Sequence, residues 1–257
     1  MLGFNGGLLG KRRVPTLEAA SGLWFPNEQS AARREAIWPS TDDPFFSSVS
    51  LLLHMDGSNG STTFTDSSLN ALTVTANGNA QISTAQSKFG GASGYFNGTS
   101  DSLTFTDPAL GTGNFTIEMW LKTNSSVQYA QLVGNETVSS GFTFVINNNS
   151  STGGQLAVYL NGSLVVSSSS GDWSDDTWHH IALTRSGSTV TLWGDGTSLG
   201  TGTSSASFNG AASMVVARNN VYTPRNLVGY IDDLRITKGV ARYTANFTPP
   251  NAAFPDA

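Results

Sequence analysis

The sequence contains no cysteine in its 257 residues. A disulfide framework, a thiolate zinc site and a cysteine nucleophile are therefore all excluded. Charged residues are also scarce, at 12% of the chain, whereas glycine occurs 28 times and serine, threonine and asparagine fill long stretches. This composition favours many short strands joined by polar turns over helices, which would need more alanine, leucine, glutamate and lysine.

Long apolar runs are absent as well. No stretch approaches the roughly 18 residues that a membrane-spanning helix requires. The start of the chain, MLGFNGGLLGKRRVP, lacks the basic-then-apolar order of a secretory signal. We therefore expect a soluble protein that does not insert into a membrane and is not exported by that route.

The net charge of −5 is unevenly distributed. Residues 1–40 carry five basic and three acidic side chains, whereas the remainder carries 8 basic and 15 acidic ones. A basic arm on an acidic body suggests that the arm docks onto another molecule. Nucleic acid is not the expected partner, because so few positive charges give little affinity at physiological salt.

Residues 1–46 differ in kind from the rest of the chain. The glycine-rich start does not fit a phosphate-binding loop, because Asn5 and Arg12 stand where glycine and serine or threonine are required. Further on, Asn27 can cap and Pro39 must end one helix of about ten residues. A helix that short is marginal alone and must pack on a partner or on its own body. The predicted docking residues are basic or aromatic: Lys11, Arg12, Arg13, Trp24, Phe25, Arg33, Arg34 and Trp38.

From Val49 onward, apolar and polar residues alternate in strand-length segments bounded by glycine, asparagine, aspartate or serine. Such spacing predicts an all-β domain over residues 47–257, built as a two-sheet antiparallel sandwich or jelly roll with an extended C-terminal tail. The turn residues predict two hairpins. Asn161-Gly162 is typical of a type I′ turn, and Gly187 stands at the tip of a second hairpin.

Two adjacent histidines lie in the strand-like stretch WHHIALTR. Neighbouring side chains of a strand point to opposite faces, so His179 should share a face with Ile181 while His180 lies on the other. The two rings then cannot converge on one metal ion. We expect one histidine half-buried beside the core and the other on the opposite surface.

Several segments together resemble one known family. In chain order they are SLLLHMDG, FTDSS, KFGGASGYFNGTSDSLTF, FTIEMWLK, TWHHIALTRSGSTVTLWGDG and GYIDDLRITKGVARYTANFTPP. This series, over roughly residues 48–250, is similar to the concanavalin A-like, laminin-G-like jelly-roll domains. The resemblance implies two antiparallel sheets face to face, one convex and one concave. The ending DDLRITKGVARYT and the arm pattern GLW…EQ…AR…WP resemble virion proteins of tailed phages.

Glycoside hydrolases of this fold carry several alternating carboxylates on one strand, two of which act as nucleophile and acid. The similar strand here, FTIEMWLKT, offers Glu118 alone. No Gly-x-Ser-x-Gly elbow is present, and the third histidine, His54, lies in an apolar stretch. The chain is therefore predicted not to be an enzyme, with no catalytic residues.

The resemblance also implies a structural calcium ion, since domains of this superfamily often carry one between the exit of the first strand and the last strand. The matching positions are Asp56 and Asp232 or Asp233, with Asp66 a weaker candidate. Calcium requires six to eight oxygen ligands. Because Asp232 and Asp233 are adjacent, they are expected to point to opposite faces. The alternative is that these carboxylates cap turns or pair with Arg235.

Large aromatic residues lie in or beside the predicted strands: Trp120, Trp173, Trp178, Trp193, Tyr159 and Tyr230. Most are expected between the two sheets. The resemblance implies that some line the concave face and stack on sugar rings, and the sequence leaves open which ones.

The functional hypothesis is a non-enzymatic structural protein on the surface of a phage particle, made in the host cytoplasm. Its arm docks onto other virion proteins, its copies form a homo-oligomer there, and its jelly roll faces outward toward a host surface glycan. A tail fibre or adhesin subunit is the first interpretation. A capsid decoration protein, such as a head fibre or cement protein, and a free carbohydrate-binding module are the alternatives.

Overall fold

The computed structural model describes residues 42–148, 154–168, 171–222 and 224–257. The chain divides into two compact units, residues 1–44 with Ala257 and residues 45–256. The predicted arm helix and the eight predicted docking residues lie outside the described residues. Among the helices of the described part, none is long and apolar enough to cross a membrane.

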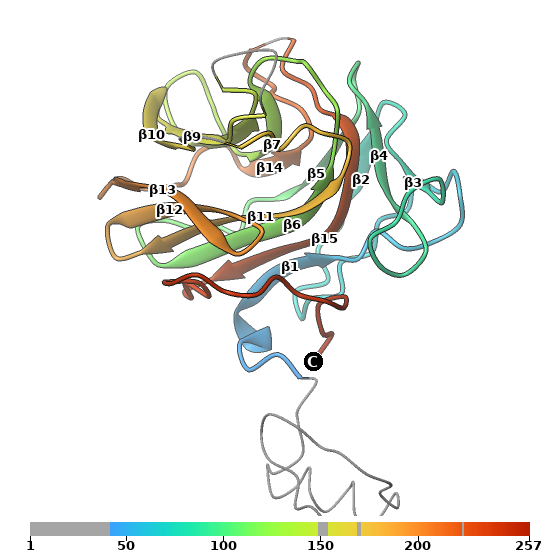
Figure 1. Cartoon of the computed structure of the whole chain (residues 1–257), viewed down its shortest axis with the longest axis horizontal. Helices are drawn as coiled ribbons and strands as arrows, with labels where there is room; N and C mark the ends of the chain where they lie inside the picture. Colours follow the sequence, from blue (N-terminus) through green and yellow to red (C-terminus); the bar gives the residue numbers. More distant parts are fainter. Residues whose placement is uncertain (1–41, 149–153, 169–170, 223) are drawn as a thin grey trace, which may run out of the picture. The chain divides into compact units, whose positions relative to one another are not determined.

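The second unit consists of two antiparallel sheets stacked face to face (Figure 1). A short 3-10 helix, η1 (Phe46–Ser48), precedes the first strand. In order across the first sheet lie β13 (Thr197–Thr203), β12 (Thr189–Gly194), β11 (Trp178–Ser186), β6 (Phe115–Lys122), β15 (Val228–Lys238), β4 (Ser93–Asn97) and β3 (Gln81–Ser83), with β1 (Val49–Leu53) also paired to β15. We call this the eight-stranded sheet.

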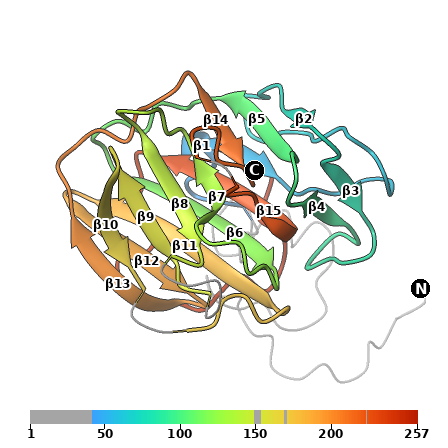
Figure 2. The ribbon, with the colours of Figure 1, turned by 90° about the horizontal axis from the view of Figure 1, so that it is seen from above.

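The second sheet has seven strands and is seen from above in Figure 2. Its order is β10 (Ser163–Ser167), β9 (Ala157–Leu160), β8 (Phe142–Ile146), β7 (Ala130–Gly134), β14 (Ser213–Val216), β5 (Ser102–Thr106) and β2 (Thr75–Asn77). The predicted all-β, two-sheet antiparallel jelly-roll sandwich is therefore confirmed.

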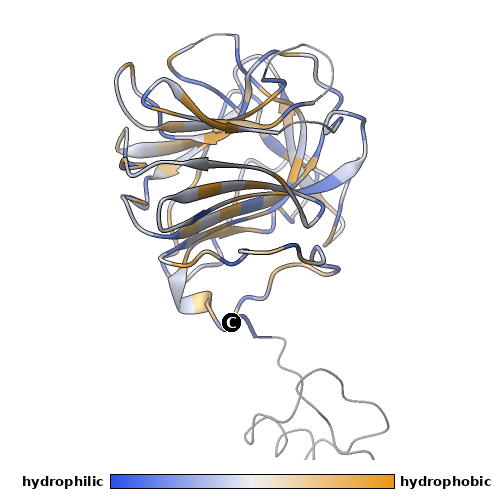
Figure 3. Ribbon diagram, turned by 60° about the vertical axis from the view of Figure 1, so that its left-hand side comes forward, coloured by the Kyte–Doolittle hydropathy of each residue, from blue (hydrophilic) through white to orange (hydrophobic). Residues whose placement is uncertain are grey.

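The core lies between the sheets because each strand buries every second side chain. In β6, Phe115, Ile117, Met119 and Leu121 join the core, while Glu118 and its outward neighbours point away from it. Figure 3 shows this alternation of apolar and polar residues along the strands. Each fully buried Leu, Ile or Phe contributes about 1.5–3 kcal/mol, so the inward residues supply most of the driving force.

Both predicted hairpins are present. Asn161 and Gly162 have φ angles of 52° and 75° between β9 and β10, as a type I′ turn requires. Gly187, with φ of 60°, lies in the turn between β11 and β12, where Ser186 pairs with Thr189. These turns set the register of the strands that flank them.

A bulge in β15 breaks its alternation. Ile231 and Leu234 both lie in the core, with two residues between them instead of one. Asp233 takes a left-handed φ of 50°, and the register with β6 shifts between Asp232 and Arg235. Asp232 and Asp233 therefore both leave the core side, and the expectation that they point to opposite faces is wrong. A bulge inserts one extra residue, which cancels the period of two.

The C-terminal segment, residues 239–256, runs along the outer face of the eight-stranded sheet, the face turned away from the other sheet (Figure 1). The main-chain N–H of Phe247 donates to the carbonyl of Gly196, and the side chain of Asn246 accepts from Ser198 N–H. Gly196 has φ of 78°, and a side chain there would meet the Phe247 carbonyl. A glycine at this turn therefore lets the segment lie against the sheet.

Candidate functional site

The outer face of the seven-stranded sheet carries a row of side chains, some buried and some partly exposed. In β5, β14, β7, β8 and β9 the inward residues pack in the core, which leaves the alternate residues on this face. They are mainly polar: Thr104, Val215, Gln131, Thr143 and Tyr159. These residues form the floor of two adjoining hollows, which we call together the outer groove.

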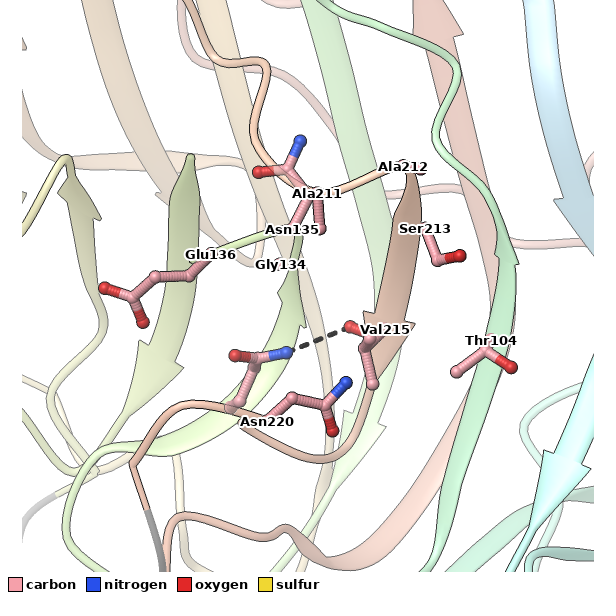
Figure 4. Close-up of a pocket in the computed structure, with 10 residues that line it drawn as sticks. Thr104, Gly134, Asn135, Glu136, Ala211, Ala212, Ser213, Val215 and Asn220 are labelled. Carbon is pink, nitrogen blue, oxygen red and sulfur yellow. Dashed lines mark hydrogen bonds between the residues drawn. The ribbon is translucent and has the colours of Figure 1, made fainter. Parts of the chain in front are cut away.

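The first hollow has a volume of about 350 Å³. It is lined by Thr104, Gln131, Gly134, Asn135, Glu136, Ala211, Ala212, Ser213, Val215 and Asn220 (Figure 4). Gln131 is buried, and its side-chain amide donates to the carbonyls of Val215 at 3.1 Å and Arg218 at 2.6 Å. Its carbonyl oxygen accepts from Thr143 at 3.0 Å. The floor is therefore fixed by buried hydrogen bonds before any ligand arrives.

The second hollow has a volume of about 300 Å³ and is lined by Tyr129, Glu136, Thr143, Tyr159, Gly162, Tyr222 and Arg225. Glu136 lines both hollows, so they adjoin. The rings of Tyr129 and Tyr159 meet edge to face with centroids 6.1 Å apart, and the Tyr159 hydroxyl donates to Asn148 at 2.6 Å. Tyr222 is 41% exposed at the rim. Volumes near 300 Å³ are at the lower end of small-ligand sites, about 300–1,000 Å³.

One cation and one carboxylate face this second hollow. The guanidinium of Arg225 lies 4.7 Å from the Tyr129 ring centroid and 4.5 Å from that of Tyr222. Glu136 accepts a hydrogen bond of 3.0 Å from the Asn219 amide. Burial and the neighbouring Tyr129 raise the pKa of Tyr159, which therefore stays a neutral hydrogen-bonding group. Aromatic faces with fixed polar groups suit binding rather than catalysis.

The predicted aromatic residues are divided between several places. Tyr159 lines the outer groove, and Trp173 packs against the core. Trp120 and Trp193 are buried outside the sandwich core, on the outer face of the eight-stranded sheet. Tyr230 pairs there with Tyr95, ring centroids 5.0 Å apart. The expectation that most large aromatics lie between the sheets is wrong for these residues, because the sheet has a second buried face.

Glu118 forms the centre of that second buried face. It is fully buried, and Arg235 donates to its Oε1 from Nε at 3.0 Å and from Nη2 at 2.9 Å. The Tyr243 hydroxyl donates to its Oε2 at 2.6 Å, and His180 Nε2 lies 3.3 Å from the same oxygen. Burial alone would raise the pKa of Glu118, but Arg235, His180 and Tyr243 outweigh it and hold the pKa at about 2. Through Tyr243, Glu118 anchors the C-terminal segment to the sheet.

The two histidines lie on opposite faces of β11, as predicted. His180 contacts the rings of Trp120, Tyr243 and Phe247 on the outer face. It is not at the surface, however, because the C-terminal segment covers it and leaves it 0% exposed. His179 lies on the core side at the rim, beside Trp173.

His179 has partners that superficially resemble a catalytic triad. Its Nε2 lies 2.9 Å from the Thr177 hydroxyl and its Nδ1 lies 2.7 Å from Asp195. Asp175 makes this set unlike a triad, because its carboxylate lies 3.1 Å from the same Nε2 and 2.7 Å from the Thr177 hydroxyl. The hydrogen bonds to Asp195 and Asp175 raise the pKa of His179, against the effect of burial. Both ring nitrogens are engaged by the chain, whereas a catalytic base needs one nitrogen free to take a proton from a substrate.

The charges of the neighbouring acidic residues Asp56 and Asp233 act on the carboxyl group of Asp232. Burial raises the pKa of Asp232 to about 7, against hydrogen bonds from the Lys88 and Phe89 amides, and the charges of Asp233 and Asp56 raise it further. The Asp232 Oδ1 atom is buried and has no hydrogen-bond partner in the described part of the chain. An unpartnered buried carboxylate oxygen beside other carboxylates suits a hard cation. We call this group the acidic corner.

Asp233 in the acidic corner is already engaged. His54 Nδ1 lies 2.6 Å from its Oδ1, and the Phe254 amide donates to its Oδ2 at 2.7 Å. Among the described residues, no three histidine or acidic side chains converge in metal-binding geometry. Asp232, with its unpartnered Oδ1 atom, and Asp56 are thus the two carboxylates of the corner that could hold a cation. Asp66 caps a turn instead, since it accepts from the amides of Leu52, Ser68 and Leu72.

His54 links the acidic corner to the end of the C-terminal segment. Its Nε2 lies 2.7 Å from Asp256, opposite the contact with Asp233. The hydrogen bond to Asp233 raises the pKa of His54 to about 9, with help from Asp256 and against burial. His54 is therefore protonated at neutral pH and bridges two carboxylates.

Comparisons with known proteins agree with this fold. The family model described as the concanavalin A-like lectin/glucanases superfamily matches residues 97–242. No curated protein sequence matches the chain. The botulinum neurotoxin serotype D/C VPI 5993 binding domain superposes with a TM-score of 0.57 and 17% identity, over 76% of this chain and 50% of that chain. The chain thus spans about half the length of that neurotoxin domain.

A shorter solved structure is matched over nearly all its length. Domain 4 of AbnA, a GH43 extracellular arabinanase from Geobacillus stearothermophilus in complex with arabinotriose, gives a TM-score of 0.54 and 18% identity. The match covers 75% of this chain and 93% of that domain. At such identities the likeness concerns the fold. The family model covers more than half of the sequence, and the chain therefore belongs to the concanavalin A-like lectin/glucanases superfamily.

Proposed function

We propose that this protein is a non-enzymatic glycan-binding module that holds its ligand in the outer groove. The observation that carries the proposal is an open groove in which Tyr129, Tyr159 and Tyr222 stand beside hydrogen-bonding groups fixed from below. Sugar rings offer apolar C–H faces for aromatic side chains and hydroxyls for polar ones. Two structures of the same fold support it: the arabinanase domain is complexed with arabinotriose, and a botulinum neurotoxin binding domain is complexed with SialylT.

A glycan array with the full chain tests the proposal, followed by titration calorimetry with the best-bound glycan. Tyr129→Ala and Tyr159→Ala should each weaken binding by roughly tenfold or more, which corresponds to about 1.4 kcal/mol. Tyr95→Ala is the matched control, because Tyr95 is a half-buried tyrosine on the outer face of the other sheet. Absence of any bound glycan would overturn the proposal. Binding lost in Tyr95→Ala but kept in the groove variants would place the site elsewhere.

The setting that we propose is the surface of a tailed-phage particle. Its support is the sequence resemblance of the arm and of the ending DDLRITKGVARYT. In this proposal the basic and aromatic arm docks onto other virion proteins, the copies form a homo-oligomer, and the jelly roll faces outward as a tail fibre or adhesin subunit. Two residues of the DDLRITKGVARYT motif stabilise the fold, since Arg235 and Tyr243 donate hydrogen bonds to Glu118.

Truncation of residues 1–40 and imaging of particles test this setting. The truncated protein should fold and no longer join particles, whereas an unfolded truncated body would show that the arm is part of the core. Labelled protein on the tail supports the adhesin role. Labelled protein on the capsid would replace the adhesin role with that of a capsid decoration protein. If the protein is absent from purified particles, the remaining interpretation is a free carbohydrate-binding module.

We also propose that the acidic corner binds a structural calcium ion. Asp232 and Asp56 would hold it, and the ion would replace the proton that burial otherwise favours on Asp232. Its contribution is to stability, since the outer groove lies on the other sheet.

A further inference from the structure

We infer that the sugar bound in the tyrosine-lined hollow carries an anionic group, a carboxylate or a sulfate, and that Arg225 is its ligand. The inference rests on the proposed function and narrows it to acidic glycans. Nothing in glycan binding as such requires an anion, because neutral sugars also stack on tyrosine. The position and partners of one cation, Arg225, point to an anionic ligand.

Arg225 is held in place by aromatic rings. Its guanidinium lies against both Tyr129 and Tyr222, at 4.7 and 4.5 Å from the two ring centroids. Such contacts restrict the side chain without using its N–H donors, which lie in the plane of the guanidinium. The fork of donors therefore remains available at the groove, where it matches the two oxygens of a carboxylate or sulfate.

No carboxylate neutralises Arg225 within the described residues. The salt bridges of that part of the chain leave it out, whereas Arg235 is paired with Glu118 at 2.9 Å. Arg185 also lacks a carboxylate but donates to three main-chain carbonyls within 3.1 Å, at Gly187, Ala206 and Ser204. Arg225 differs from both, because its half-buried charge has only the two rings as described side-chain partners. A half-buried cation without a counterion favours an anionic ligand.

Glu136 restricts the ligand further. Its carboxylate lines the same hollow and is bound on one oxygen by Asn219. A negative charge there disfavours the binding of polyanions, and the carboxylate oxygens can accept hydrogen bonds from sugar hydroxyls. The two charges together fit a sugar with one acidic group directed toward Arg225 and hydroxyls directed toward Glu136. The net charge of −5 for the whole chain likewise opposes general adhesion to polyanions.

Matched pairs of acidic and neutral probes test the inference with the full chain. Sialyllactose against lactose and trigalacturonic acid against its methyl ester examine carboxylates, and sulfated against unsulfated galactose oligomers examine sulfate. The acidic member of at least one pair should bind roughly tenfold or more tightly, as hydrogen bonds to charged groups allow. Its affinity should fall as salt rises, whereas a neutral sugar should show no such dependence.

Three variants identify the anion ligand. Arg225→Gln should reduce binding of the acidic probe to the level of its neutral partner, and Arg225→Lys should give an intermediate affinity because it keeps charge without the fork. Glu136→Gln should increase the affinity for the acidic probe. Lys238→Gln is the control, an exposed cation on the other sheet, and should change nothing. Thermal melting of each variant checks that the fold is intact.

The outcomes separate the inference from the function beneath it. Equal binding of neutral and acidic partners, sensitive to Tyr129→Ala but not to Arg225→Gln, would overturn the acidic specificity and leave glycan binding standing. Failure to bind any probe or array glycan would overturn both. A loss with Lys238→Gln equal to that with Arg225→Gln would show that general charge, and not Arg225, attracts the ligand.

Discussion

The outer faces of the two sheets differ in whether the chain covers them. On the eight-stranded sheet, the C-terminal segment covers a Glu–Arg–Tyr group, Glu118, Arg235 and Tyr243, in which the carboxylate is fully buried. On the seven-stranded sheet, Glu136, Arg225 and Tyr159 line a groove that is open to solvent. The same three residue types thus occur on a closed face and on an open one.

The difference shows how burial decides what a polar residue does. On the closed face the charge of Glu118 is satisfied within the chain, because an unpaired buried charge is costly. Arg235 and Tyr243 therefore bind Glu118 directly. On the open face solvent or a ligand can satisfy the groups, so Arg225 needs no carboxylate from the chain. The residues left without internal partners on the open face are the ones available to a ligand.

The largest effect should come from replacing the two glutamates in parallel. Glu118→Gln leaves Arg235 buried without its counterion and should lower the free energy of unfolding by about 3–5 kcal/mol. Glu136→Gln, the matched change on the open face, should alter it by less than about 0.5 kcal/mol. Guanidinium denaturation measures both. Equal losses would show that the two faces do not differ in the way described.

Calcium should have the next largest effect on the stability of the folded protein, and it should bind on the closed face. At about 100 times its dissociation constant, an ion bound only to the folded state adds about 2.7 kcal/mol, or roughly 5–10 °C in the melting temperature. Asp232→Asn should abolish this gain, whereas Asp66→Asn, a turn cap, should keep the response to calcium. An unchanged melting temperature in chelator and in calcium would exclude the ion.

The calcium effect should also depend on pH. The folded pKa of Asp232, raised by burial to about 7, lies above its ordinary value, so without an ion the stabilisation is present at low pH and lost as pH rises through 7. Calcium competes with the proton for the carboxylate. The gain in melting temperature should therefore be larger at pH 8 than at pH 5.5.

Much of the fold follows from the sequence because each strand repeats one simple requirement. In β6 and β11, apolar residues at every second position must face the core, and this alternation also separates His179 from His180. The bulge in β15 left a weaker signal. Ile231 and Leu234 are three residues apart, a spacing that a regular strand cannot bury on one face. Reading that spacing would have placed Asp232 and Asp233 together.

The candidate site was less predictable because distant segments build it. Tyr129 and Arg225 are almost a hundred residues apart, and the pairing of Val215 with Gly134 places β14 beside β7. Nothing periodic in the sequence marks a loop tyrosine as a groove residue. The closed face posed the same difficulty, since Glu118 and Arg235 meet across 117 positions. Pairings of this range depend on the finished sheet order.

The smallest expected effect on stability comes from His54, which contacts Asp256 at the end of the C-terminal segment on the closed face. Hydrogen bonding to Asp233 raises its folded pKa to about 9, above the ordinary 6.5, so its stabilisation is complete below pH 6.5 and is lost as pH rises through 9. Because Asp256 is 67% exposed and His54 partly so, solvent screening limits the contribution to about 1 kcal/mol. Denaturation at pH 6 and pH 9.5 should show this loss in the parent and not in His54→Gln. The open face supplies the control, since Tyr129→Ala should keep the parent's pH dependence. A pH dependence unchanged in His54→Gln would assign it to other groups and leave the C-terminal segment held by its remaining contacts, those of Tyr243, Phe247 and Phe254.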